Sequence, residues 1–224
     1  MGVFLQARLG STRLARKALL PLAGTTVLQL AMRALARVEA GVHALLTEPA
    51  SEGAFAGLAR EEGFELFVGS EQDVLDRFCK AAARFGVRRV VRATGDNPLV
   101  CPAQVRGLLE LHEAQGWELS HYLGPPLGTG VEVVEAEALA EAGEEAKDPY
   151  EREHVTPYLY RHPDRFRVGE PPCPAAWHFP EARLTLDTAE DYELLRALFG
   201  ELYRGEPLET EELVRWMQWL RERR

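Results

Sequence analysis

The feature that most constrains the fold is an alternation of short apolar runs and amphipathic helical patterns along the first half of the chain. Contiguous apolar runs predict strands, and apolar residues three and four positions apart predict helices. This alternation is typical of an α/β fold, in which a mixed, mainly parallel sheet lies between helices that cover both faces. The expected strands are 3–5, 42–47, 65–68 and 89–93, and the expected helices are 26–38, 51–62 (with Ser51 as its cap), 72–85 and 102–115.

The second half of the chain is less regular but gives no sign of a second domain. We find no internal repeat, low-complexity tract or linker, so residues 1–224 are predicted to form a single domain. Because residues 2–6 read as a strand, no leader is expected and the protein is predicted to be cytoplasmic. The expected strands are 118–123, 131–135 and 183–186, and the expected helices are 137–146, 150–161, 189–203 and 210–223.

Charge is distributed unevenly and limits the classes of partner. The chain has 35 acidic and 26 basic residues and a net charge of -9, which argues against a broad nucleic-acid face. Residues 1–38, however, carry six basic residues and no acidic one. An electropositive patch on an acidic protein suits a small, multiply charged anion such as a nucleoside triphosphate. No apolar stretch approaches the roughly 18 residues of a membrane span, and the three cysteines include no C-x-x-C pair.

The stretch Q-A-R-L-G-S-T-R-L-A-R-K (Gln6–Lys17) directly follows the first expected strand. Two interpretations are open: a solvated basic turn, or a loop whose amides and cations hold phosphate. It is not a Walker loop, because the required glycine and hydroxyl residue are absent. Lysine is rare in this chain, and its retention at Lys17 favours a phosphate site. The phosphate-binding candidates are Gly10 and Ser11 through their amides, and Arg8, Arg13 and Lys17 through their charges.

Two aspartates lie where expected strands end. Asp96 is in T-G-D-N-P-L (Thr94–Leu99), and Asp187 is in L-T-L-D-T-A-E-D (Leu184–Asp191). Each segment also reads as an ordinary turn or helix cap. Because ligands of open α/β sheets bind beyond the carboxyl ends of the strands, the two carboxylates are candidates for a shared Mg²⁺ site.

Two further features have competing interpretations. His154 lies in a charge-rich segment, where it contacts a substrate or belongs to an exposed helix start. The apolar stripe Leu213, Trp216, Met217 and Leu220 in the last expected helix either packs on the sheet or forms a homodimer.

Taken together, the motifs resemble the spore coat polysaccharide biosynthesis protein F family of cytidylyltransferases, relatives of CMP-Kdo and CMP-sialic acid synthetases. The resemblance spans nearly the whole chain, and several long motifs in the same order make it specific. Besides the opening stretch, the motifs are G-S-E-Q-D-V-L-D-R-F (69–78), V-R-A-T-G-D-N-P-L-V (91–100), G-V-E-V (130–133), D-P-Y-E-R-E-H-V-T-P-Y (148–158) and L-D-T-A-E-D-Y (186–192).

The resemblance implies a nucleotide-diphospho-sugar transferase (GT-A-like) fold and a Mg²⁺-dependent nucleotidyltransferase. The implied reaction moves a cytidylyl group from CTP to a sugar, expected to be acidic, and releases pyrophosphate in cell-surface polysaccharide biosynthesis. Some related enzymes are dimers. Two alternatives stay open: a glycosyltransferase of the same general fold that uses a nucleotide sugar, and a non-catalytic nucleotide-binding subunit.

The resemblance also implies roles for individual residues, by position in the motifs. Three groups would act on the triphosphate and its metal: Arg8, Arg13 and Lys17 as catalytic cations, Gly10 and Ser11 as phosphate contacts, and Asp96 and Asp187 as Mg²⁺ ligands. Nucleotide contacts would come from Leu5, Gln6, Ala7, Asp76, Arg77, Thr94 and Gly95, and sugar contacts from Glu132 and His154.

The chain departs from the family pattern at two places. Pro-Gly usually precedes the lysine of the opening motif, and this chain has Ala15-Arg16. Before G-V-E-V the family often has an arginine and an aspartate, where this chain has Leu127 and Gly130. The second departure lies towards the sugar and leaves the acceptor the least defined part of the prediction.

Overall fold

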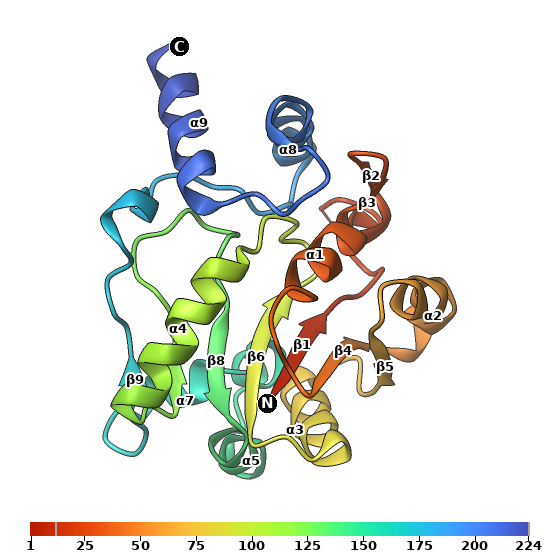
Figure 1. Cartoon of the computed structure of the whole chain (residues 1–224). Coiled ribbons are helices and arrows are strands. Elements are labelled where there is room, and N and C mark those ends of the chain that lie inside the picture. The colour runs from red at the N-terminus through yellow and green to blue at the C-terminus, as the bar shows by residue number, and fades with distance from the viewer. Residues whose placement is uncertain (12, 224) are drawn as a thin grey trace.

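A seven-stranded sheet forms the centre of the molecule in the computed structural model, which describes residues 1–11 and 13–223. Strand β8 runs antiparallel to both its neighbours, and the other pairs are parallel. The predicted mixed, mainly parallel sheet is therefore confirmed. In spatial order the strands are β5 (Glu65–Val68), β4 (Val42–Thr47), β1 (Gly2–Gln6), β6 (Arg89–Thr94), β8 (Glu132–Glu135), β7 (Leu119–Ser120) and β9 (Val168–Gly169) (Figure 1).

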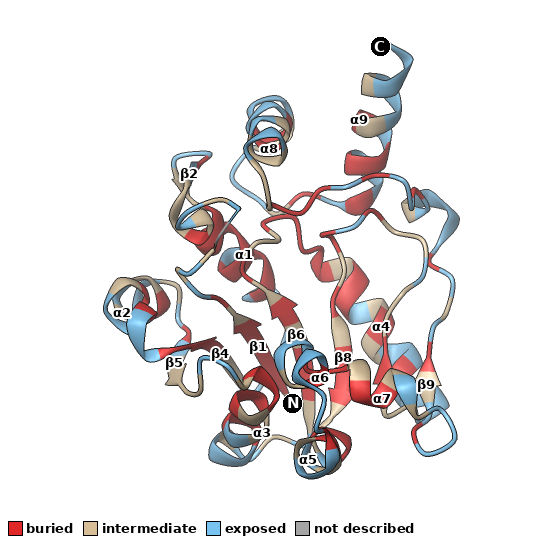
Figure 2. Cartoon of the chain, turned by 180° about the vertical axis from the view of Figure 1, so that it is seen from behind, coloured by how far each residue is buried: buried red, intermediate tan, exposed pale blue. Residues whose placement is uncertain are grey.

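Helices cover both faces of this sheet. Because successive side chains of a strand point to opposite faces, Val3 and Leu5 of β1 pack in one apolar cluster and Phe4 packs in the other. Seen from behind, the central strands are coloured as buried between the helical layers (Figure 2). One face carries α1 (Val27–Leu35), α2 (Glu52–Glu61) and α4 (Pro102–Gln115), and the other carries α3 (Val74–Phe85), α5 (Ala136–Glu145), α6 (Pro149–His154) and α7 (Pro157–Arg161).

Two C-terminal helices, α8 (Ala189–Leu202) and α9 (Thr210–Glu222), lie beyond one end of the sheet (Figure 1). They share a third apolar cluster with Leu99 and Leu186, which belong to the segments that follow β6 and precede α8. The stripe in α9 contributes to this cluster: Leu213 and Trp216 are buried there against α8 and the neighbouring loops, so the stripe packs inside the molecule but not on the seven-stranded sheet as predicted. The C-terminal helices thus support the loops at that end of the sheet.

The helix predicted for residues 150–161 is two helices, α6 and α7, separated by Val155 and Thr156. Pro157 causes the break, because proline has no amide hydrogen and its ring clashes with the preceding helical turn. Val155 has φ 78° and is fully buried, and the amide of Thr156 donates to the carbonyl of His154 at 3.0 Å. The sharp bend turns the hydroxyl of Thr156 towards the sheet.

The strand predicted for residues 183–186 does not form a ladder. Its neighbours are loops, so it makes isolated backbone bonds: Leu184 N–H donates to the carbonyl of Leu127 at 2.8 Å, and Leu186 N–H donates to that of Asp96 at 3.0 Å. Three short strands were not predicted: β9 and the hairpin β2 (Pro21–Leu22) and β3 (Thr25–Thr26). Within residues 1–11 and 13–223, no helix has the length and hydropathy needed to cross a bilayer.

Candidate functional site

A cavity of about 510 Å³ opens where β1 and β6 end, and we call it the loop cavity. It brings together thirteen of the sixteen residues predicted for the site: Gln6, Ala7, Arg8, Gly10, Ser11, Arg13, Lys17, Arg77, Thr94, Gly95, Asp96, His154 and Asp187. Of the other three, the side chain of Leu5 is fully buried in the core, Asp76 lies in the first turn of α3 outside the lining, and Glu132 lines two adjoining cavities.

The start of the opening loop is fixed to the neighbouring strand and to the segment after it. Ala7 donates its amide to the carbonyl of Leu46 at 3.0 Å and accepts a hydrogen bond from the hydroxyl of Thr47 at 2.8 Å. The amide of Leu9 donates to the hydroxyl of Ser51 at 2.8 Å. Ser51 stands before α2 but makes no capping bond, so its predicted cap role is replaced by an anchor for this loop. Thr12 lies outside the described residues.

Gly95 lets the loop after β6 approach the loop after β1. Its amide donates to the carbonyl of Gln6 at 2.8 Å. A Cβ at this position would lie 2.8 Å from the Cβ of Ala7 and 2.9 Å from a methyl of Leu28, which is too close for any other residue without a shift. The glycine of T-G-D-N-P is therefore required by packing.

Lys17 joins the two predicted metal ligands. Its ammonium donates to Asp96 Oδ2 at 2.6 Å, to Asp187 Oδ1 at 2.8 Å and to the carbonyl of Leu186 at 2.9 Å. These bonds use all three of its donors. An ammonium in this state must give up at least one of these partners before it can bind a phosphate.

Asp187 is the most heavily paired carboxylate of the cavity. Besides Lys17 it contacts Arg13 at 2.8 Å and Arg183, and its amide donates to the carboxylate of Asp191 at 2.8 Å. Burial raises the pKa of Asp187, but the hydrogen bonds and charges of Lys17, Arg183 and Arg13 outweigh burial and lower that pKa below its ordinary value. Asp187 is therefore an ionised acceptor at neutral pH.

The donor set of this pair suits Mg²⁺. Two carboxylates converge on one cationic group, and Mg²⁺ is commonly held by one or two carboxylates together with substrate phosphates. Residues 1–11 and 13–223 contain no cluster of three or more acidic, histidine or cysteine side chains that could hold a metal ion. A metal ion on this pair of carboxylates would therefore need further ligands, such as substrate phosphates. The carboxylates that would hold a Mg²⁺ ion are those of Asp96 and Asp187, which in this structure are bound to Lys17.

Arg77 is a second cation beside the cavity, and its side chain is buried. It is 2% exposed and lines the loop cavity, and within the described part of the chain its Nε and Nη1 have no hydrogen-bond partner. Burial lowers the pKa of Arg77, while the carboxylate of Glu48 raises it. A buried guanidinium with free donors is stabilised when an anion binds beside it.

Ala15-Arg16, the departure in the opening motif, includes a residue with a left-handed backbone. Arg16 has φ 52° and ψ 32°, the left-handed conformation that glycine adopts without strain. The backbone thus keeps a glycine-like geometry where the family usually has Gly. Arg8, at the other side of the cavity, pairs with Glu153 of α6 at 3.3 Å, and both side chains are about half exposed.

Two further cavities meet the loop cavity at Arg92. The sheet cavity, of about 480 Å³, lies between β6 and the segment 121–131, and the side cavity, of about 490 Å³, lies beside α6 and α7. Arg92 lines all three cavities, Glu132 lines the sheet and side cavities, and His154 lines the side and loop cavities.

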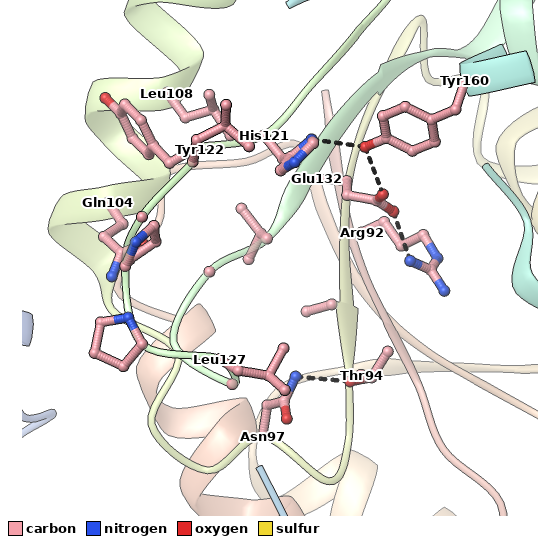
Figure 3. A pocket seen from close by; sticks show the side chains of 18 residues that line it. Arg92, Thr94, Asn97, Gln104, Leu108, His121, Tyr122, Leu127, Glu132 and Tyr160 are labelled. Atoms are coloured by element: carbon pink, nitrogen blue, oxygen red, sulfur yellow. Dashed lines mark hydrogen bonds and ion pairs between the residues drawn. The ribbon is translucent and has the colours of Figure 1, made fainter. Parts of the chain in front are cut away.

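Glu132 organises the wall between these cavities. Its carboxylate accepts from Arg92 at 2.5 Å, from Thr156 at 3.0 Å and from the hydroxyl of Tyr160 at 2.9 Å, and the ring nitrogen of His121 lies 2.7 Å from that hydroxyl (Figure 3). Burial and the charge of Glu132 raise the pKa of Tyr160, which therefore stays protonated and donates. His154 is exposed, and the centroid of its ring lies 4.3 Å from that of Tyr150, with the two ring planes tilted by 47°.

Sequence reasoning missed Arg92, Glu153 and Arg183. Arg92 alone left a signal: an arginine inside an otherwise apolar strand, two residues before T-G-D. Glu153 and Arg183 read as ordinary surface charges, and only the fold brings them to Arg8 and Asp187.

Comparisons with known proteins agree with the resemblance. A family model described as cytidylyltransferase matches residues 3–214. The spore coat polysaccharide biosynthesis protein SpsF of Bacillus subtilis (strain 168) is 32% identical over 217 residues, which cover 94% of this chain and 90% of that protein.

Solved structures extend the likeness to the fold. A cytidylyltransferase from Leptospira borgpetersenii serovar Hardjo-bovis (strain JB197) matches with a TM-score of 0.91 at 28% identity, covering 99% of this chain and 94% of that one. A CMP:2-keto-3-deoxy-manno-octonic acid synthetase complexed with CTP matches with a TM-score of 0.66 at 18% identity, covering 89% and 98%. The predicted nucleotide-diphospho-sugar transferase fold is confirmed.

Proposed function

The chain belongs to the cytidylyltransferase family and is a nucleotidyltransferase, and from this membership we propose that it moves a cytidylyl group from CTP to a sugar hydroxyl and releases pyrophosphate. The name of the Bacillus relative and the CTP bound to the synthetase of similar fold support this proposal. We place the reaction in cell-surface polysaccharide biosynthesis, in line with that relative.

The observation that carries the proposal is the meeting of Lys17, Asp96 and Asp187 in the loop cavity. The cations of this cavity suit a triphosphate, and the carboxylate pair suits the metal ion that accompanies one. Arg77 adds a buried positive charge beside this cavity. The triphosphate would bind here through the amides of Gly10 and Ser11 and through Arg8, Arg13 and Lys17, with the base bordered by the backbone of residues 5–7.

In the proposed reaction the sugar oxygen attacks the α-phosphorus in line. A bond forms between that oxygen and phosphorus, the bond from phosphorus to the bridging oxygen breaks, and pyrophosphate leaves with both electrons of that bond while the hydroxyl proton passes to water. Lys17 and the loop amides stabilise the negative charge that develops on the phosphates. Mg²⁺ bound to Asp96 and Asp187 would supply further charge neutralisation.

The sugar is proposed to lie beside Arg92, at the junction of the three cavities. Glu132 and His154 are proposed to face it, because both line cavities that meet there. The family resemblance favours an acidic sugar.

Pyrophosphate release with each of the four nucleoside triphosphates and Mg²⁺, over a panel of sugars, tests the function. We expect release with CTP and a drop of about 100-fold or more in Asp96→Asn, because a group that neutralises developing charge is lost. Asp164→Asn is the matched control, since Asp164 lies in an exposed turn between α7 and β9. An Asp96→Asn enzyme as active as the control would contradict the proposed metal site.

Two other results would redirect the function. Turnover of a nucleotide sugar without use of free triphosphate would favour the glycosyltransferase. Binding of CTP without turnover for any acceptor would favour the non-catalytic subunit.

A further inference from the structure

The two oxygens of the Asp187 carboxylate have different surroundings. Oδ1 accepts from the ammonium of Lys17 and from Arg13, each at 2.8 Å, and Asp187 and both cations line the loop cavity. Oδ2 accepts from Nη2 of Arg183, which does not belong to that lining in the described part of the chain. Asp187 thus turns one oxygen to the cavity, while Arg183 holds the other from outside.

Arg183 is itself held by a second carboxylate. Its Nε lies 3.4 Å from Asp191 Oδ1. Asp191 Oδ2 accepts the amides of Asp187 at 2.8 Å and Thr188 at 2.9 Å, as part of the capping box at the start of α8. The guanidinium therefore lies between two carboxylates, and the outer carboxylate is anchored to the backbone.

The backbone of Arg183 is fixed by the segment 121–131, which forms a wall of the sheet cavity. Leu127 donates its amide to the carbonyl of Ala182 at 2.9 Å and accepts from the amide of Leu184 at 2.8 Å. These two bonds lie on either side of Arg183 in the sequence and pair it with Leu127. Both the backbone and the guanidinium of Arg183 are therefore held in place.

This arrangement differs from an isolated ion pair at a protein surface, which contributes little. Arg183 is 44% exposed, but Asp187 and Asp191 are each only 13% exposed, and the three charges form one network around a planar guanidinium. In metal sites, the outer partners of a carboxylate ligand fix its orientation, and loss of such a partner typically costs about 10–100-fold in metal affinity or activity.

We propose that Arg183 is a positioning residue, which together with Asp191 holds Asp187 so that Oδ1 stays turned to the loop cavity, where it would bind Mg²⁺ with Asp96. This proposal rests on the proposed function and adds two residues to its metal site. Neither of the two would contact the metal or the triphosphate, and each acts through Asp187.

Binding of Mn²⁺, which takes the same carboxylate and water ligands as Mg²⁺, tests this role without turnover. Electron paramagnetic resonance of the free ion measures its Kd without nucleotide or sugar, in a Lys17→Met parent in which no ammonium occupies the two carboxylates. We expect Arg183→Lys to weaken Mn²⁺ binding about tenfold, because the charge is kept and the planar fork is lost. Asp191→Asn should weaken it similarly, although its side-chain oxygen can still accept the backbone amides.

The double variant separates positioning from charge. If Asp191 acts only through Arg183, the double variant binds Mn²⁺ no more weakly than the weaker single variant. Losses that add would show that Asp191 acts through its charge and would overturn the relay. An Arg183→Lys protein that binds Mn²⁺ like its parent would overturn the positioning role. Arg196→Met, which removes an exposed arginine of α8 that pairs with Glu193, is the matched control and should bind Mn²⁺ like the parent.

A second measurement uses the chain with Lys17 intact. The Mg²⁺ concentration that gives half of the maximal rise in Tm with CTP should increase about tenfold in Arg183→Lys and stay unchanged in Arg196→Met. Equal Tm values of these two variants without ligand would show that the loss is not one of folding.

The outcomes also separate this role from the proposed function. A protein that binds no Mn²⁺ and shows no Mg²⁺-dependent rise in Tm with CTP would overturn the proposed metal site and the role of Arg183 with it. Metal binding that Arg183→Lys weakens, in a protein that releases no pyrophosphate, would support the positioning role and count against the proposed reaction.

Discussion

At the scale of single residues, Arg16 shows how a departure in sequence can keep a backbone geometry. It stands where the family pattern described for the opening motif has glycine, and its backbone is in the left-handed region. A side chain in that conformation costs about 1 kcal/mol relative to glycine. Arg16 is exposed, so its side chain does not offset this cost by burial.

Arg16→Gly is therefore expected to raise the free energy of unfolding by about 0.5–1 kcal/mol, because the strain disappears while the glycine adds some entropy to the unfolded chain. Urea unfolding measures the change. Arg16→Ala separates the backbone effect from the lost charge and should give no increase. A stability gain in both variants would show that the charge of Arg16, and not its backbone, destabilises the loop.

Lys17 has two roles that a single substitution can separate. Its ammonium is bound to the same two carboxylates that are proposed to hold Mg²⁺. We expect Lys17→Met to lower pyrophosphate release by about 100-fold, because a cation at the phosphates is lost. The same variant should gain more thermal stability from Mg²⁺ alone than the unaltered protein, because nothing competes for Asp96 and Asp187. Lys147→Met is the control, and equal Mg²⁺ shifts in all three proteins would refute the competition.

The candidate site was predictable to different degrees at this scale. Lys17, Asp96 and Asp187 were predictable, because each has a side chain suited to phosphate or metal and each follows an expected strand. Arg8 was predicted, but its partner Glu153 was not, since nothing local distinguishes an exposed glutamate that faces the cavity. The cavity between β6 and residues 121–131 was not predictable, because the path of that segment leaves no pattern in the sequence.

At the scale of elements, the periodicity of apolar residues predicted the sheet and its helical layers. It did not predict the shortest strands or the break between α6 and α7, which depend on tertiary packing. Strand β1 is buried on both faces, so its apolar run is continuous and easy to detect, and the apolar runs of β4 and β6 are each interrupted by only one side chain, His43 and Arg92. β9 has two residues and left no pattern. The break at Val155 was missed because the helical spacing of apolar residues continues through it, although Pro157 was a signal for it.

His112 connects α4 to β7 and β8 and makes stability depend on pH. It is fully buried, with one ring nitrogen 2.8 Å from the hydroxyl of Ser120 and the other 3.0 Å from the carboxylate of Glu135. Burial lowers the pKa of His112 below 6.5, its ordinary value, and outweighs the opposing bond to Glu135. The unfolded chain therefore binds a proton at His112 more readily than the folded chain does. The contribution of neutral His112 to the free energy of unfolding is fully present above pH 6.5 and is lost as the pH falls through the pKa of His112 in the folded protein.

We expect the difference in unfolding free energy between the unaltered protein and His112→Gln to shrink as the pH is lowered from 7.5 to about 5.5, by at most about 1.4 kcal/mol per pH unit. Urea titrations at several pH values measure it. His154→Gln, which changes an exposed ring, should show no such trend. A difference that stays constant or widens on acidification would contradict the assignment of a neutral, buried imidazole.

At the scale of the whole molecule, the protein combines a net charge of -9 with a cavity rich in cations. The positive electrostatic potential of the loop cavity is expected to attract a multiply charged nucleotide, and added salt should weaken this attraction. Composition alone did not locate this cavity, whereas the motifs around Asp96 and Asp187 predicted that residues from distant parts of the sequence would share it.

Binding of CTP with Mg²⁺ should stabilise the whole fold, because the ligand binds the folded chain and not the unfolded one. At about 100 times its Kd, the gain is about 2.7 kcal/mol, or roughly 5–10 °C in Tm for a chain of this size. Differential scanning fluorimetry with CTP, UTP, ATP and GTP at equal concentration measures it. A Tm that rises equally with all four nucleotides would contradict specificity for cytidine.

The bond between Lys17 and Asp187 joins residues 170 positions apart. Ribosomes add about 5–20 residues per second, so Lys17 emerges roughly 10–30 s before its partner is made. During that interval β1 can already pair with β4 and β6, and Lys17 can bind Asp96, which directly follows β6. A nascent chain of this protein therefore forms half of its carboxylate pair with the parallel core of the sheet, and the second half arrives only when most of the chain has been made.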